Sequence, residues 1–182
     1  PLASDTRVFL VGAEARSLKT LCDSTVAVVR DMRPHPIAGG RFIVFTQPGP
    51  DDVMLPYLEE VLAASFDKLT VALRYVPRSP VHIHIYPRVE DLARVSRLTE
   101  TEIRNSGTVA LCKYNRLMFT SPRDMVYGYE WADTVSHEFA HYLLLKRGGS
   151  RIPIWLHEGI AKSLEALWRG DDGRLLDAYE QD

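Results

Sequence analysis

The chain has 182 residues, of which 46% are hydrophobic and 25% charged, enough for one core or for one domain with an appended element. A formal net charge of −2 provides no electrostatic footprint for nucleic acid. No apolar run reaches the roughly 18 residues that a membrane span needs, and no signal-peptide pattern is present. We expect a piece of a longer protein, because the chain begins at Pro1 without a methionine and ends in a polar stretch.

The chain has two cysteines, Cys22 and Cys112, which do not form a C-x-x-C pair. The pattern therefore indicates neither a cysteine metal site nor a redox motif. We interpret each as a buried free thiol, and a disulfide between them stays open because spacing carries no geometry.

Residues 1–40 predict an N-terminal helical and linker segment. Val8–Val11 reads either as a short strand or as the beginning of a helix. From Glu14 to Met32 apolar residues recur at spacings of three and four, which predicts a helix, although the run contains several β-branched residues that favour strands. The following Arg33–Pro36 stretch, with its two prolines, predicts a linker in which His35 is exposed and without a role.

The main domain is predicted to cover residues 41–170. Arg41–Thr46 has the composition of a strand. Asp51 or Asp52 then begins a long amphipathic helix that ends near Arg74.

Val81–Tyr86 alternates apolar and other side chains, which predicts a half-buried strand. His82 and His84 lie on the face opposite the apolar residues. Two histidines at this spacing can bind a metal, but we interpret them as partly exposed strand residues.

Val89–Leu98 predicts a short helix, which the polar residues Thr99–Asn105 bring to an end. Gly107–Lys113 and Leu117–Ser121 then predict two strands joined as a hairpin.

A helix that begins near Tyr129 carries one complete H-E-x-x-H motif. Side chains four residues apart lie on one face of a helix, so His137 and His141 can present two imidazoles to one metal ion. Glu138 can then reach a water molecule at the open coordination position, where a hydrolase needs a general base.

A second helix, after a turn rich in Arg, Gly and Ser, supplies a candidate third ligand in Glu158. The small residues Gly159 and Ala161 suit a close approach of the two helices. Glu165, two turns further on, and Asp133, one turn before His137, are candidate acceptors for the free N–H of a ligand histidine.

The H-E-x-x-H motif followed by Trp155–Glu165, which reads W-L-x-E-G-x-A-x-x-x-E, resembles the gluzincin metallopeptidases and in particular the small peptidase MA-like domains. The resemblance covers residues 137–165 closely. A metzincin would need Gly and His where this chain has Leu144 and Arg147. The resemblance implies zinc (Zn²⁺) as cofactor, with His137, His141 and Glu158 as ligands and Glu138 as the catalytic base.

The implied fold is a zincin-like α+β domain, in which a mixed sheet with an antiparallel edge hairpin packs on the H-E-x-x-H helix and on a second, Glu-bearing helix. In the resembled family an extended substrate adds to the sheet edge before the metal helix by backbone hydrogen bonds. The matching residues here are Gly107, Thr108, Val109, Ala110 and Leu111. An ordinary hairpin whose edge is protected by a loop is the alternative.

The resemblance thus predicts a zinc metalloendopeptidase that hydrolyses a peptide or protein substrate by metal-activated water. One part is missing, because gluzincins carry a further His or Tyr that donates to the oxyanion, and only Tyr179 lies beyond Glu165, in the polar tail at 171–182. Tyr127, Tyr129 and His157 precede Glu165 in the sequence, and we expect His157 to point away from the site.

A zinc-stabilised, non-catalytic binding or assembly module with the same fold is therefore the second hypothesis. A metal-free pseudo-enzyme is disfavoured because every motif residue is present. By resemblance alone, a location outside the cytoplasm is weakly favoured.

Overall fold

A computed structural model gives the fold and describes residues 13–169. The segment Val8–Val11 and the tail at 171–182 lie outside these residues, as does Tyr179. Within the described residues, none of the helices combines the length and apolar character that a bilayer span requires.

The centre of the molecule is a five-stranded mixed sheet with the order β1-β2-β3-β5-β4. The three inner strands are parallel to one another, and each edge strand is antiparallel to its neighbour. The strands are β1 (Arg33–Ile37), β2 (Phe42–Thr46), β3 (Val81–Tyr86), β4 (Ala110–Lys113) and β5 (Arg116–Thr120).

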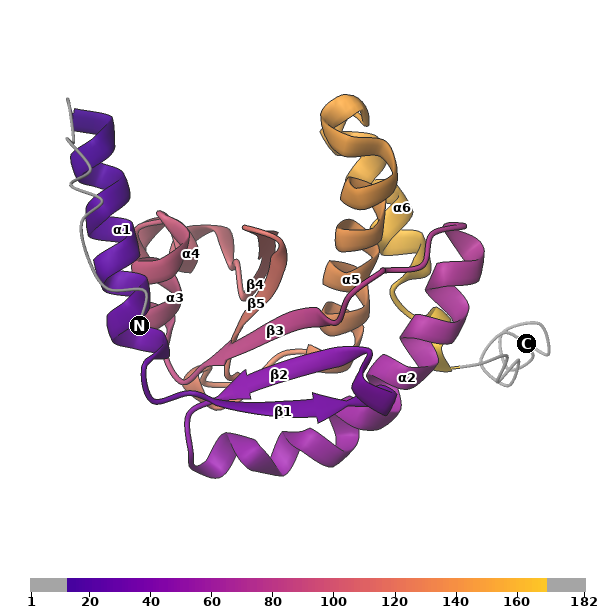
Figure 1. The fold of residues 1–182 in the computed structure, drawn as a ribbon, viewed down its shortest axis with the longest axis horizontal. Helices are drawn as coiled ribbons and strands as arrows, with labels where there is room; N and C mark the ends of the chain where they lie inside the picture. The colour runs from indigo at the N-terminus through magenta and orange to yellow at the C-terminus, as the bar shows by residue number, and fades with distance from the viewer. Residues whose placement is uncertain (1–12, 170–182) are drawn as a thin grey trace, which may run out of the picture.

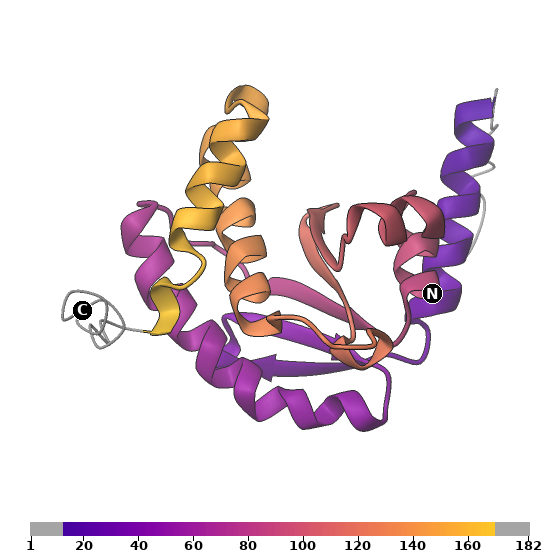
Figure 2. The same cartoon turned by 180° about the vertical axis from the view of Figure 1, so that it is seen from behind.

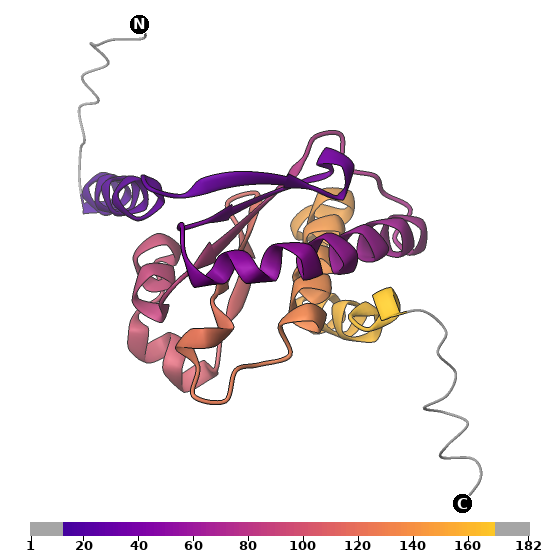
Figure 3. The same cartoon turned by 90° about the horizontal axis from the view of Figure 1, so that it is seen from below.

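Helices cover both faces of this sheet, so the predicted α+β class with a mixed sheet agrees with the structure. One core lies between the sheet and α2 with α5, and a second lies between the opposite face and α1, α3 and α4. α5 and α6 run side by side away from one end of the sheet, and α1 and α3 pack together at the other (Figures 1 and 2). Seen from below, α2 passes across the sheet (Figure 3). The helices are α1 (Ala13–Val29), α2 (Leu55–Ala72), α3 (Val89–Ser96), α4 (Glu100–Ser106), α5 (Trp131–Gly148) and α6 (Ile154–Leu164).

The linker predicted at Arg33–Pro36 is wrong, because these residues form the edge strand β1. Proline is tolerated on a sheet edge, where its missing N–H faces away from the neighbouring strand. His35 is not an exposed loop residue either. It is partly buried, and its Nε2 lies 3.0 Å from the Thr46 hydroxyl on β2.

The half-buried strand predicted at Val81–Tyr86 is covered on both faces. His82 is exposed, but His84 is 7% exposed and Tyr86 is fully buried. Parallel inner strands are normally packed on both sides, and the layer formed by α1 and α3 covers this second face. Burial lowers the pKa of His84 to about 3, so the core holds a neutral imidazole.

A helix, α4, replaces the polar segment expected at Thr99–Asn105. Thr99 and Glu102 form a capping box, in which each side chain bonds the backbone N–H of the other residue. The pattern T-x-x-E was therefore a readable helix start. The predicted hairpin is present, with Tyr114 and Asn115 at φ of 54° and 62° in its two-residue turn.

Candidate metal centre

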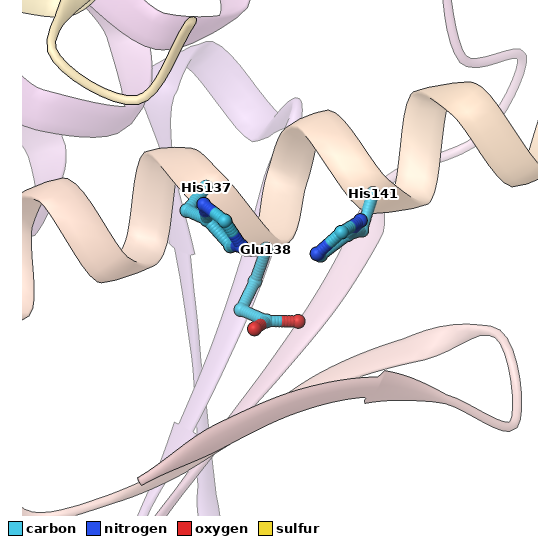
Figure 4. A group of neighbouring side chains, drawn as sticks. All are labelled: His137, Glu138 and His141. Carbon is cyan, nitrogen blue, oxygen red and sulfur yellow. The ribbon is translucent and has the colours of Figure 1, made fainter. Parts of the chain in front are cut away.

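His137 and His141 come from the middle of α5 and face the same side of it. Their ring centroids are 4.6 Å apart, and the rings are nearly perpendicular. One ligand atom from each histidine and one from Glu138 lie within 4.8 Å of one another. Figure 4 shows the three side chains on the same side of α5. Both histidine side chains are mostly buried, 19% and 10% exposed, so they form a semi-enclosed donor pair.

Glu158 on α6 places its carboxylate opposite this pair. Its Oε2 lies 3.5 Å from the Nε2 atom of His137 and 3.4 Å from that of His141. These distances are long for N–H···O hydrogen bonds. They are close to the ~3.3 Å that separates two ligands bound at about 2.0–2.1 Å in a tetrahedral zinc site. The expected convergence of these three side chains is present, and the three donors fit a divalent metal.

The turn between the helices sets the position of α6. Gly149 ends α5 with a φ of 60°, a conformation that L side chains rarely adopt. A Cβ at Gly148 would lie 2.6 Å from the Ile152 side chain, so the turn packs tightly there. Ala161 of α6 is fully buried among core residues that include α5 side chains, which fixes the helix pair.

Gly159, in contrast, does not mediate the close approach that was expected of it. A Cβ built there would meet nothing within 4 Å. The small residue that the packing of α6 uses is Ala161.

Glu165 holds the outer nitrogen of His137. Its Oε2 lies 3.2 Å from His137 Nδ1, and its side chain is 17% exposed. A carboxylate at Nδ1 favours the tautomer that keeps the proton there, which leaves the Nε2 lone pair directed at Glu158 and the shared centre. Lys162 contacts the other oxygen of the same carboxylate.

His157 lies beside His141 as Glu165 lies beside His137, so the prediction that His157 points away from the site is wrong. The two Nδ1 atoms are 2.6 Å apart and the rings are stacked. The Nε2 atom of His157 is buried without a partner among the described residues. When His141 donates from Nδ1, its Nε2 lone pair is free for a metal. The readable signal was a histidine next to the candidate ligand Glu158.

Among the residues that the structure describes, Asp133 has no hydrogen bond to His137 or His141. Its carboxylate accepts from the Trp168 indole at 2.9 Å and from the Arg169 guanidinium at 2.6 Å. It therefore ties the start of α5 to the residues that follow α6, and the prediction that it supports the metal site is not what the structure shows.

Glu138 is 8% exposed and points from α5 toward the neighbouring strand (Figure 4). Burial, followed by the charge of Glu158, raises its pKa to about 8, while a hydrogen bond from the Cys112 backbone N–H opposes this shift. Burial also lowers the pKa of His141 to about 4, which keeps the imidazole neutral. A neutral imidazole is the form that binds a metal.

The strand beside Glu138 is the sheet edge β4, which begins at Ala110. Of the stretch expected to form the edge, 107–111, only Ala110 and Leu111 belong to this strand, because Gly107 ends α4 in a left-handed conformation. The Thr120 N–H donates to the Val109 carbonyl. By the alternation of an antiparallel ladder, the backbone groups of Ala110 and Cys112 then face away from β5.

Neither nearby tyrosine is aimed at this centre. The Tyr129 hydroxyl donates to the Thr120 carbonyl at 2.6 Å, and Tyr127 is 98% exposed.

Comparisons of the chain with family models, with curated proteins and with solved structures gave no match.

Proposed function

We propose that this chain is a zinc-dependent metallopeptidase of the gluzincin type with a zincin-like fold. The observation that carries the proposal is the spacing of three donor atoms, with Glu158 Oε2 at 3.5 Å and 3.4 Å from the two histidine Nε2 atoms. Two imidazoles and one carboxylate form a donor set typical of catalytic zinc, which keeps a further position open. The ion would be held by His137, His141 and Glu158.

When bound, zinc supplies a Lewis acid that lowers the pKa of water toward about 7 and polarises a carbonyl group. The chain's own residues do the rest. Glu165 and His157 hold the outer nitrogens of the two ligand histidines and so orient both rings.

Glu138 is the proposed general base. Its carboxylate lies between the histidines and β4, anchored by the Cys112 N–H. A divalent cation bound nearby would favour the ionised form of this carboxyl group. Glu138 would then accept a proton from water that attacks a peptide held along the edge strand, and return that proton to the leaving amine. An extended substrate would add to the outward-facing backbone of Ala110 and to the Cys112 carbonyl, because the Cys112 N–H is already bonded to Glu138.

The substitution Glu138→Gln tests this role. It preserves the shape of the side chain and the acceptor for the Cys112 N–H, so we expect zinc binding and the thermal unfolding temperature to stay unchanged. Peptide hydrolysis should fall by at least about 100-fold, because general acid–base catalysis contributes roughly that much or more. Zinc content and cleavage of an unstructured protein, with and without chelator, measure both effects. Undiminished turnover in the variant would remove Glu138 from the mechanism.

A zinc-stabilised binding module remains the second candidate. The hydrogen bond between Glu138 and the Cys112 N–H favours it, because it gives the carboxylate a structural use that needs no chemistry. Stoichiometric zinc without cleavage of any peptide would support this candidate.

A further inference from the structure

Two recesses flank Glu138, and they differ in character. The first, called the apolar recess here, has a volume of about 440 Å³ and is lined by Cys112, Leu145, Ile152 and Ile154, with His141 and Glu158 at the metal centre. The second, called the acidic recess, has about 390 Å³ and is lined by carboxylates together with Lys162. These carboxylates belong to Glu130, Asp133, Glu138 and Glu165.

The recesses follow one another along the edge strand. The acidic recess adjoins Val109 and His137, whereas the apolar recess adjoins Cys112 and His141. β4 and α5 therefore pass the metal centre in the same direction, from the acidic recess to the apolar one.

Antiparallel pairing with β4 would give a bound peptide a single chain direction past the two recesses. Antiparallel pairing is the more stable arrangement per residue. The backbone groups of Ala110 and the Cys112 carbonyl face outward to receive it, while the Cys112 N–H is bonded to Glu138. A segment antiparallel to β4 enters beside Cys112 and leaves beside Val109. It crosses the apolar recess before the metal centre and the acidic recess after it.

We infer that the apolar recess binds the side chain of the residue immediately before the cleaved bond, and that the substrates are extended peptides with a large aliphatic or aromatic residue at that position. This rests on the proposed metal centre. The volume suits such a side chain, and aliphatic residues of α5, of the turn and of α6 form its walls. The acidic recess disfavours an acidic residue after the bond, since Asp133 and Glu165 already have cationic partners while Glu130 adds a further negative charge.

Metal-binding inhibitors test the inference without requiring catalysis. We expect N-acetyl-leucine hydroxamate, whose side chain precedes the metal-binding group, to bind the zinc-loaded chain about tenfold or more tightly than N-acetyl-alanine hydroxamate, because three more carbons are buried. A 2-isobutylsuccinyl hydroxamate, whose isobutyl group follows the metal-binding group, should gain little over its unsubstituted parent. Titration calorimetry measures all four compounds.

Leu145→Gln and Ile154→Gln supply the variants. Both side chains are partly or largely exposed, at 42% and 81%, so the fold tolerates the change. The preference for leucine over alanine should fall to about twofold or less in each. Val71→Gln is the matched control, because Val71 is 75% exposed on α2 and does not line the recess; it should keep the full preference.

The outcomes separate the two proposals. Equal binding of the leucine and alanine compounds, or a gain seen only with the isobutylsuccinyl compound, overturns this inference whether or not peptides are cleaved. A clear leucine preference in a chain that cleaves no peptide supports the recess and contradicts the peptidase. A chain that binds no zinc contradicts both.

Discussion

Two pairs of histidines sit in very different surroundings in this molecule. His137 and His141 lie one turn apart on α5, and Glu158 faces both of them. His82 and His84 lie two apart on β3, where one ring is exposed and the other is buried and stacked 4.5 Å from the Phe45 ring. Spacing alone admits both pairs as metal ligands.

What separates the pairs is the chemistry around the ring nitrogens. Each ring of the α5 pair has a polar partner at Nδ1, Glu165 for His137 and His157 for His141, and a carboxylate near Nε2. His84 has no partner at Nδ1 among the described residues. The charged group with the largest effect on its pKa is Arg116, whose positive charge disfavours a further cation there. A pair of imidazoles becomes a credible metal site when carboxylates and oriented tautomers accompany it.

The sharpest way to break this comparison is to remove a ligand from each pair. His137→Ala should weaken zinc binding by more than about 100-fold, since even a residue that only supports a ligand typically contributes 10–100-fold. His82→Ala should leave zinc affinity unchanged. Competition with a chromogenic chelator measures both values. Equal losses of zinc affinity in the two variants would contradict a metal site specific to the histidines of α5.

Removing Glu158 tests whether the carboxylate is part of the set. Glu158→Ala should lower zinc affinity by about the same factor as His137→Ala, because a ligand is lost in each case. Glu60, an exposed glutamate on α2, provides the control substitution Glu60→Ala, which should have no effect. Full zinc affinity in Glu158→Ala would contradict the three-ligand centre.

A smaller effect is expected from the residue behind His137. Glu165→Ala removes the carboxylate 3.2 Å from Nδ1, and we expect zinc affinity to fall by about 10–100-fold as the ring loses its fixed tautomer. Glu165→Gln, whose amide oxygen can still accept from Nδ1, should recover part of this loss. If both variants bind zinc as tightly as the parent, the contact with His137 is only structural.

The sequence pattern located the helices that carry the site through the H-E-x-x-H motif and the turn that follows it, although the apolar residues of α5 lie on more than one face. It failed at β1, where two prolines resemble a linker but occupy a sheet edge. It also failed at His84, because alternation within one strand cannot reveal that a second helical layer covers the opposite face.

For the site, the motif identified the three residues on α5 as candidates, and helix geometry placed Glu158 across from them. The side chains that orient the histidines were harder to assign. Asp133 is one turn from His137, yet Trp168 and Arg169 hold it. His157 faces inward because Ala161 packs α6 into the core at one particular rotation. Its position next to Glu158 marks it as a candidate, but the sequence does not show which way its ring points.

The smallest expected effect is the pH dependence of folding stability that comes from His84, the buried histidine of β3. His84 has a pKa of about 3 in the folded chain, against 6.5 for the ordinary side chain. As pH falls below 6.5 the unfolded chain takes up a proton that the folded chain refuses, so the free energy of unfolding decreases until about pH 3. Between pH 7 and pH 5 this one group should lower the free energy of unfolding by about 2 kcal/mol, at roughly 1.4 kcal/mol per pH unit below 6.5.

Urea unfolding of the metal-free chain should therefore show a shallower pH dependence in His84→Phe than in the parent. His82→Phe, on the exposed side of the pair, should keep the parental slope. Identical slopes for the parent and His84→Phe would mean that His84 takes up a proton in the folded chain as readily as in the unfolded one. The pKa of His84 would then no longer distinguish the two histidine pairs.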